Sequence, residues 1–300
     1  MDSTTEMDST TENATVQAST ATPSLLSAAT KLGKVGLIVS NLQRSLQFYS
    51  AVIGLQVLAR SEDFVLLGVA AENLVLLELE QRKGVRPLTG KRLGLYHFAL
   101  LLPSRADLSS FAEHLQALGI RAGMSDHLVS EAFYLEDPDG LTIEVYADRN
   151  RKEWVWHNGE IAVATQPLNL GKLLDLPHQS WAGVPRGSTL GHIHLYIGDV
   201  RQAEQLYHQG LGMNVRSRGL PGALFLAAGD YHHHIGLNTW AGNVSVASET
   251  DARLSIWELK VQPADLSTMS DRMLSSGWRF LNDATFVDPW GIAMRLVAVQ

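Results

Sequence analysis

The sequence predicts an α+β protein made of four βαβββ modules, because one order of elements (a strand, a helix and three strands) occurs four times. The spacing of a helix cap, a tyrosine and a glycine is the same in two of the copies: Asn41, Tyr49 and Gly54; Asp199, Tyr207 and Gly212. The other two copies share a turn, at residues 137–140 and 288–291. Odd copies resemble odd copies and even copies resemble even ones, which indicates two similar halves.

The first module begins with residues 35–40, a short apolar run that is typical of a strand. Asn41 caps a predicted helix over residues 42–53, which ends at Gly54. Three strand patterns follow, over residues 55–59, 64–69 and 74–79.

The second module contains the two residues from which the functional interpretation starts. His97 lies in the apolar strand pattern of residues 95–102, and Glu144 lies in the last strand pattern, residues 141–146. A helix is predicted between them over residues 106–118. Burying a carboxylate is unfavourable unless it is paired or bound to a metal, so a glutamate on a buried-looking strand is a candidate for a functional site.

The third and fourth modules repeat the same order of elements. In the third module, strands are predicted at residues 191–197, 213–218, 223–227 and 232–238, with a helix at 200–210. The fourth module covers residues 254–299, with a helix at 264–276.

Composition excludes several classes of function. The net charge of −7 argues against a nucleic-acid-binding protein, which would carry a basic patch. No apolar run of about 18 residues is present, so no membrane span is expected. The chain has no cysteine, which excludes disulfides and thiolate chemistry and fits a cytoplasmic location. Any bound metal must therefore be held by histidine, carboxylate, tyrosine or backbone oxygen, a set that suits iron(II), manganese, zinc or nickel.

The predicted domain organisation has four parts. They are a disordered tail, rich in Ser, Thr and Ala (residues 1–30); an N-terminal domain of two modules (31–148); a connector (149–190); and a C-terminal domain of two modules (191–300). The connector contains Trp154, Trp156 and Trp181 and is expected to pack on the core. The edge strands and the paired modules are compatible with a homodimer.

Four stretches carry a family resemblance: GLYHFA (residues 94–99), SDHLVSEA (125–132), DPDG (137–140) and YHHHIGLNTW (231–240). With the four modules, they resemble the vicinal oxygen chelate superfamily, which includes glyoxalase I, type I extradiol dioxygenases and bleomycin-resistance proteins. The chain is most similar to the four-module proteins that resemble catechol 2,3-dioxygenase. The resemblance implies paired-module domains and extradiol cleavage of a small catechol-type substrate by dioxygen.

The resemblance also implies a divalent metal, with iron(II) foremost and manganese(II) or another ion as alternatives. Its ligands in extradiol enzymes are a His from the first strand of one module, and a His and a Glu from the first and last strands of the next. Carried over to this chain, the second and third ligands fall on His97 and Glu144. The first ligand position falls on Gly36, which has no side chain, so Glu78 in the last strand of the first module is the candidate replacement.

Acid–base and substrate-binding roles are carried over from the same resemblance. His127 and Tyr134 occupy positions where a neutral imidazole takes a proton from a catechol hydroxyl and a phenol hydroxyl binds the ring oxygen. Ser130 and Glu131 are candidate substrate contacts. The alternative is that His127 makes a loop hydrogen bond and Tyr134 is a core residue.

In the C-terminal half, only one of the corresponding ligand positions carries a usable side chain. The three positions are His194, Trp257 and Arg295. His192 and His194 would share one face of a strand, and with His232 or His234 they could form a histidine-rich site. Strand alternation would send His233 to the opposite face. The alternative is a polar strand that lines a second cavity.

Two further functions remain open at this stage. A catalytically degenerate family member would bind a small molecule without metal, and Gly36, Trp257 and Arg295 favour this interpretation. A glyoxalase-like isomerase or epimerase is favoured by Glu78.

Overall fold

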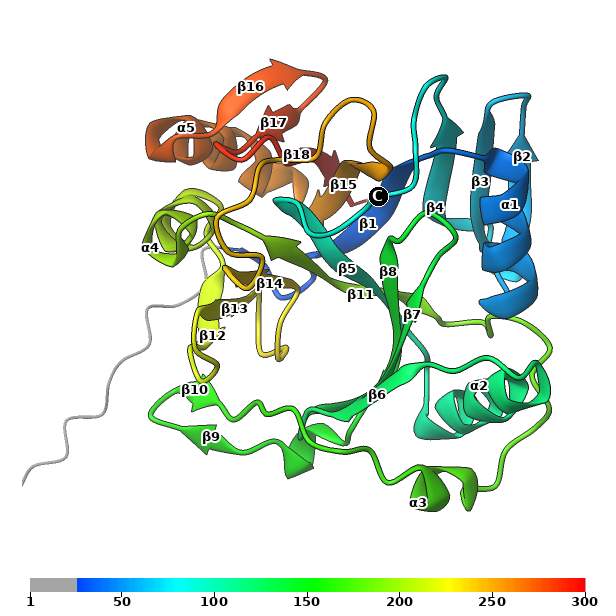
Figure 1. The fold of residues 1–300 in the computed structure, drawn as a ribbon. Helices are drawn as coiled ribbons and strands as arrows, with labels where there is room; N and C mark the ends of the chain where they lie inside the picture. The colour runs from blue at the N-terminus through cyan, green and yellow to red at the C-terminus, as the bar shows by residue number, and fades with distance from the viewer. Residues whose placement is uncertain (1–25, 300) are drawn as a thin grey trace, which may run out of the picture.

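The structure is a computed structural model that describes residues 26–299. Four βαβββ modules form two eight-stranded sheets, which confirms the predicted fold class (Figure 1). Most of the predicted disordered tail, residues 1–25, lies outside the described range, whereas Leu26 and Thr30 at its end are buried. Within residues 26–299, no helix is both long and apolar enough to cross a membrane.

The first module follows the sequence prediction closely. Its elements are β1 (Lys31–Val39), α1 (Leu42–Gln47), β2 (Gln56–Arg60), β3 (Phe64–Val69) and β4 (Leu74–Gln81). The side chain of Asn41 caps α1 by accepting a hydrogen bond from the Arg44 N–H at 2.9 Å. The predicted helix does not stay α-helical to its end, because α1 is followed by the π-helical stretch η1 (Phe48–Val52).

The other three modules repeat this plan. The second comprises β5 (Gly94–Leu101), α2 (Arg105–Ala117), β6 (Gly123–Asp126), β7 (Ser130–Glu136) and β8 (Thr142–Asp148). The third comprises β11 (Thr189–Tyr196), α4 (Val200–Ala203), the π-helix η4 (Glu204–Gly210), β12 (Asn214–Ser217), β13 (Ala223–Ala227) and β14 (Ile235–Asn238). The fourth comprises β15 (Arg253–Val261), α5 (Leu266–Ser276), β16 (Arg279–Asn282), β17 (Thr285–Val287) and β18 (Ala293–Ala298).

The modules pair differently from the sequence expectation. One sheet joins modules 2 and 3 in the strand order β12-β13-β14-β11-β5-β8-β7-β6, and the other joins modules 4 and 1 in the order β16-β17-β18-β15-β1-β4-β3-β2. Each junction is an antiparallel pair of first strands, β5 with β11 and β1 with β15. All four first strands are similar apolar runs, so local pattern does not show which two of them pair. The sheets therefore do not follow the sequence halves 31–148 and 191–300.

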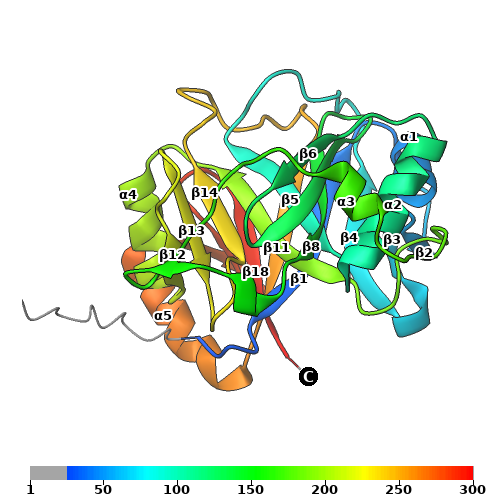
Figure 2. The same cartoon turned by 90° about the horizontal axis from the view of Figure 1, so that it is seen from below.

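The central strands of the sheet formed by modules 2 and 3 separate apolar from polar side chains. In β5, Phe98 and Leu100 belong to the main hydrophobic core, whereas His97 and Ala99 alternate with them and face the other way. In β11, Ile193 belongs to the same core and lies between two histidines. One face of this sheet is thus packed on the core, and the other presents imidazoles. Figure 2 shows β5, β8 and β11 side by side in this sheet.

The connector packs on the second and third modules, as expected from its tryptophans. It forms a short hairpin of β9 (Trp156–His157) and β10 (Glu160–Ile161), and a short helix, α3 (Leu170–Leu174). In Figure 1 it runs along the bottom of the molecule, from β9 past β6 to α3. Trp154 is buried, and its Nε1 donates to the Val129 carbonyl at 3.2 Å.

A buried Tyr–Asp hydrogen bond joins the modules in each half of the chain. The Tyr49 hydroxyl donates to Oδ2 of Asp137 at 2.9 Å, and the Tyr207 hydroxyl donates to Oδ2 of Asp288 at the same distance. Each carboxyl also accepts backbone N–H groups of its own turn. The repeated sequence features therefore build the same contact twice.

Candidate metal centre

Three buried side chains from the second and third modules point at one another. Nε2 of His97 lies 3.0 Å and Nε2 of His192 lies 3.1 Å from the same oxygen of Glu144, Oε2. His97 comes from β5, Glu144 from β8 and His192 from β11. All three are buried, and one potential ligand atom from each lies within 4.8 Å of the others. The junction of β5 with β11 therefore creates the cluster.

The chemistry of this cluster fits a bound divalent metal. Nδ1 of His97 and Nδ1 of His192 have no hydrogen-bond partner among the described residues, and the 3.0 Å contact of His97 Nε2 with Glu144 lacks the geometry of a hydrogen bond. Burying such groups without a partner is unfavourable, and a metal ion would satisfy the converging Nε2 atoms. Two imidazoles and one carboxylate form the set that leaves coordination positions open.

Electrostatics favour the protonation states that metal binding needs. Burial lowers the pKa of His97 and outweighs the opposite effect of Glu144, so its imidazole is neutral at pH 7. Burial alone would raise the pKa of Glu144, but His192 and His97 hold it well below its usual range. The cluster thus offers a neutral imidazole and an ionised carboxylate, as metal binding requires.

The cluster lies in a cavity of about 180 Å³. Its polar wall includes Ser125, His127, Ser130 and Tyr134 from the β6–β7 region, and His194 and His233 from the third module. Its apolar wall includes Val129, Leu220, Phe225 and Trp240. Tyr96 of β5, together with Val163 and Thr165 from the connector, completes the lining. The cavity is therefore built from the second module, the third module and the segment that joins them.

His127 and Tyr134 form a hydrogen-bonded pair at this cavity. Nδ1 of His127 lies 2.7 Å from the carbonyl oxygen of Ala164, and Nε2 lies 2.7 Å from the Tyr134 hydroxyl. A carbonyl only accepts, so Nδ1 carries the hydrogen; Nε2 of the neutral ring then accepts from Tyr134. Tyr134 stands opposite Glu144 in the register of β7 and β8. The pair thus presents a basic nitrogen and a hydroxyl next to the metal cluster.

Comparison with known proteins shows the family. The model of the glyoxalase/bleomycin resistance protein/dioxygenase superfamily matches residues 31–145. A catechol-2,3-dioxygenase of Bacillus subtilis (strain 168) is 38% identical over 256 residues, which cover 83% of this chain and 89% of that protein. The chain belongs to this superfamily. This result confirms the family resemblance that was recognised in the sequence.

Solved structures show that the fold of this superfamily extends over the chain. A Bacillus subtilis protein has a TM-score of 0.59 at 15% identity, with 89% of this chain and 84% of that chain covered. Glyoxalase I from Zea mays has a TM-score of 0.56 at 19% identity, with 90% and 92% covered. At these identities the likeness concerns the fold alone.

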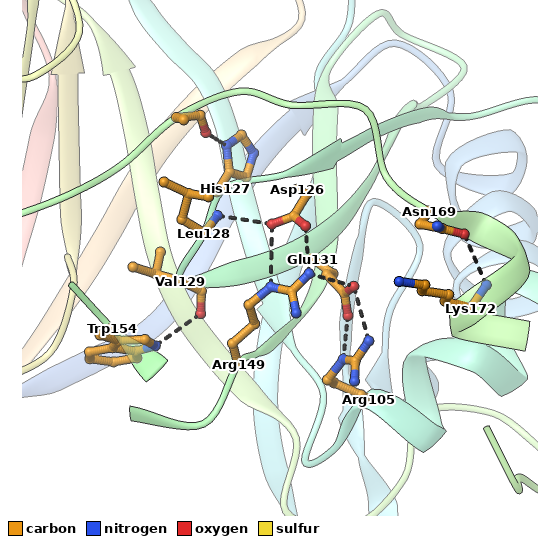
Figure 3. A network of polar contacts seen from close by, with 11 residues as sticks. Arg105, Asp126, His127, Leu128, Val129, Glu131, Arg149, Trp154, Asn169 and Lys172 are labelled. Atoms are coloured by element: carbon orange, nitrogen blue, oxygen red, sulfur yellow. Dashed lines mark hydrogen bonds and ion pairs between the residues drawn. The ribbon is translucent and has the colours of Figure 1, made fainter. Parts of the chain in front are cut away.

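Glu131, a predicted substrate contact, does not line the cavity around the cluster. It is buried and forms ion pairs with Arg105 and with Arg149, the latter at 2.9 Å. Arg149 also binds Asp126, whose Oδ1 accepts the Leu128 N–H at 2.9 Å (Figure 3). Leu128 has a φ of +70°, a left-handed conformation that a leucine rarely adopts. The ion-pair network therefore anchors the turn that carries His127.

Glu78 and Gly36 lie away from the cluster. Glu78 is in β4 of the other sheet, where it pairs with Lys34 at 2.5 Å and stands beside Gly36. A Cβ on Gly36 would lie 2.6 Å from Oγ of Ser255 and 3.1 Å from Cγ2 of Ile256, so a side chain at this position would require its neighbours to move. Glu78 was expected as the third ligand because the first two modules were expected to pair. In the structure His192 of the third module takes that place in the cluster.

The remaining histidines of the third module have other partners. Nε2 of His194 accepts from the Asn238 amide at 2.9 Å, so its lone pair is already used. His232 lies 2.9 Å from Oδ1 of Asp148 and 2.7 Å from Nδ1 of His233. Nδ1 of His234 accepts the Ala228 N–H at 3.3 Å. The expected histidine-rich site of His192, His194, His232 and His234 is not assembled among the described residues.

His233 lines the cavity, contrary to the prediction from strand alternation. Strand β14 begins only at Ile235, so the alternation of a strand does not apply to residues 232–234. The His233 ring packs against the His192 ring at a tilt of 45°, with centroids 4.2 Å apart. Trp240, Phe225 and the connector residues were also missed, because only the tertiary structure brings them to the site. The repeated histidines were the one sequence signal for His233.

Proposed function

We propose that this chain is a metal-dependent extradiol ring-cleaving dioxygenase that acts on catechol-type substrates. The observation that carries the proposal is the convergence of His97, His192 and Glu144 in a buried cavity that also contains the His127–Tyr134 pair. The name of the Bacillus subtilis relative, catechol-2,3-dioxygenase, agrees with this chemistry. The substrates are then a small aromatic diol and dioxygen.

In this proposal His97, His192 and Glu144 hold the metal, and iron(II) is the ion best suited to such a set. The bound metal would gather the two vicinal oxygens of the diol and dioxygen in a fixed arrangement. The side chains of the cavity supply the remaining chemistry.

Proton transfer is the part of the reaction that the protein's own groups perform. Nε2 of His127 is held as an acceptor because Nδ1 donates to the Ala164 carbonyl. It takes a proton from a diol hydroxyl, directly or through the Tyr134 hydroxyl at 2.7 Å. The same imidazolium then returns the proton as the ring opens. Ser130, which lines the cavity, is a hydrogen-bond partner for the substrate.

The two alternative functions lose the residues that favoured them. Gly36 supported a metal-free binding protein, and Glu78 supported a glyoxalase-like isomerase, but both lie in the other sheet. Trp257 and Arg295 also belong to that sheet. A cytoplasmic location and a homodimer stay predictions.

Metal content and ring cleavage test the proposal together. Protein purified without oxygen should carry about one iron per chain and cleave catechol with uptake of one O₂. His192→Ala and Glu144→Ala should lose both the metal and the activity. Glu78→Gln is the matched control, because it changes a glutamate of the other sheet, and it should keep both. Metal retained in His192→Ala with full activity, or no metal in the wild type, would refute the proposal.

A further inference from the structure

We infer that the site selects uncharged single-ring catechols and rejects catechols that carry an anionic substituent. The inference rests on the proposed function and concerns its choice of substrate. It comes from the side chains that line the cavity, not from the metal cluster itself.

Apart from the proposed metal, which the two diol oxygens would occupy, the described lining of the cavity has no basic side chain to receive a substituent's negative charge. None of the described residues that line it is a lysine or an arginine, and its one carboxylate is Glu144. Arg149, which follows β8, is held by Asp126 and Glu131. Lys91 binds the backbone carbonyl of Trp240 at 3.1 Å and is not part of the lining.

An anionic substituent would therefore be buried without a partner. Burying an unpaired carboxylate is strongly unfavourable. The two diol oxygens of the substrate, not the substituent, take the metal-facing side of the cavity. The rest of the ring meets the apolar wall.

That apolar wall is well defined. Phe225 packs against His194 with ring centroids 5.5 Å apart, and Trp240 packs against the same imidazole at 5.7 Å. Nε1 of Trp240 donates to the Pro221 carbonyl at 2.8 Å, which fixes the turn that carries Leu220. A cavity of about 180 Å³ with this wall suits one ring with a small apolar substituent.

A pair of substrates of the same size tests the charge selection directly. 3,4-Dihydroxyphenylacetate and its amide differ in charge but hardly in shape. We expect kcat/KM to be about 100-fold higher for the amide. The free energy equivalent to this ratio is smaller than the penalty for burying an unpaired charge. Ratios within about threefold of one would overturn the inference.

Leu220 provides the matched pair of variants. It is half-buried on a turn outside the strands, so it tolerates a longer polar side chain. Leu220→Arg places a cation at the cavity and should reduce the preference for the amide about tenfold. Leu220→Gln adds polarity without charge and should leave the ratio where the wild type has it. An equal effect of both variants would show that wall polarity, not charge, sets the selection.

Binding separates this inference from the proposed function. The Kd of each compound is measured without oxygen by calorimetry on the protein as purified. If the protein cleaves no catechol but binds the amide about 100-fold more tightly than the acid, the inference stands and the proposed function fails. If both compounds are cleaved and bound equally well, the proposed function stands and the inference fails. Binding of neither compound would overturn the inference.

Discussion

The buried carboxyl of Asp137 gives a stability prediction whose size follows from the structure. Its Oδ1 accepts the N–H groups of Asp139 and Leu141 at 2.8 and 2.9 Å, and its Oδ2 accepts the Tyr49 hydroxyl. Burial raises the pKa of Asp137 to about 6 in spite of these hydrogen bonds. Asp137→Asn keeps a carbonyl oxygen for the backbone and an amide for Tyr49, but it removes the titration.

The direction of the effect follows from proton linkage. Between about pH 4 and pH 6 the folded protein holds a proton on Asp137 that the unfolded chain has lost. The free energy of unfolding of the wild type therefore contains a contribution that falls as the pH rises through this window. A pKa difference of about 2 corresponds to about 3 kcal/mol. The free energy of unfolding of Asp137→Asn minus that of the wild type should therefore rise by about 3 kcal/mol from pH 4 to pH 7.

Urea unfolding of both proteins from pH 4 to pH 7, followed by tryptophan fluorescence, measures this difference. Other groups that titrate in the window, such as buried histidines, affect both proteins equally and cancel. Burial also raises the pKa of Asp288 to about 6, so Asp288→Asn should repeat the result. The double variant should show the sum, because the two turns belong to different sheets. A difference that stays flat or falls as the pH rises would refute the reasoning.

Three further predictions concern the site. Tyr134→Phe removes the hydroxyl that donates to His127 and should lower kcat, measured by oxygen uptake, about 100-fold. The metal content should not change. An unchanged kcat would exclude Tyr134 from proton transfer. Gly236→Ala would place a Cβ 2.7 Å from Cγ of His194. It should lower the free energy of unfolding by about 1–3 kcal/mol and lower the Tm in thermal unfolding. An unchanged Tm would contradict the close packing. Because burial lowers the pKa of His97 from the ordinary 6.5, protons should displace the metal only at lower pH. In a dialysis series the midpoint of metal loss should lie below pH 6.5, and a midpoint above pH 6.5 would contradict that environment.

Local structure was predictable where neighbouring residues decide it. Asn41 and Gly54 mark the beginning and the end of the first helical segment, because a cap and a left-handed stop act within a few residues. The turn at residues 137–140 was recognised for the same reason. The strand predicted over residues 232–238 was wrong in its first half, since alternation gave no sign that residues 232–234 lie outside β14.

The cluster could be predicted only in part. His97 and Glu144 stood out because a histidine and a carboxylate on buried strands need partners. His192 was noticed but was assigned to a separate site. Its place beside His97 depends on the register of β5 against β11, in which His192 faces Ala99. Such a register joins residues about a hundred positions apart, and no local pattern contains that information.

The pairing of the first module with the fourth has a consequence for synthesis of the chain. The sheet of modules 2 and 3 can close once residue 238 has left the ribosome, so the candidate metal cluster can form before the fourth module is made. Strand β1 instead pairs Val35 with Trp257, and must wait for more than two hundred residues to be made. At about 5–20 residues per second this takes roughly tens of seconds. During that time an apolar strand has one unpaired edge, and this early strand is the place where we expect nascent chains to meet chaperones or one another.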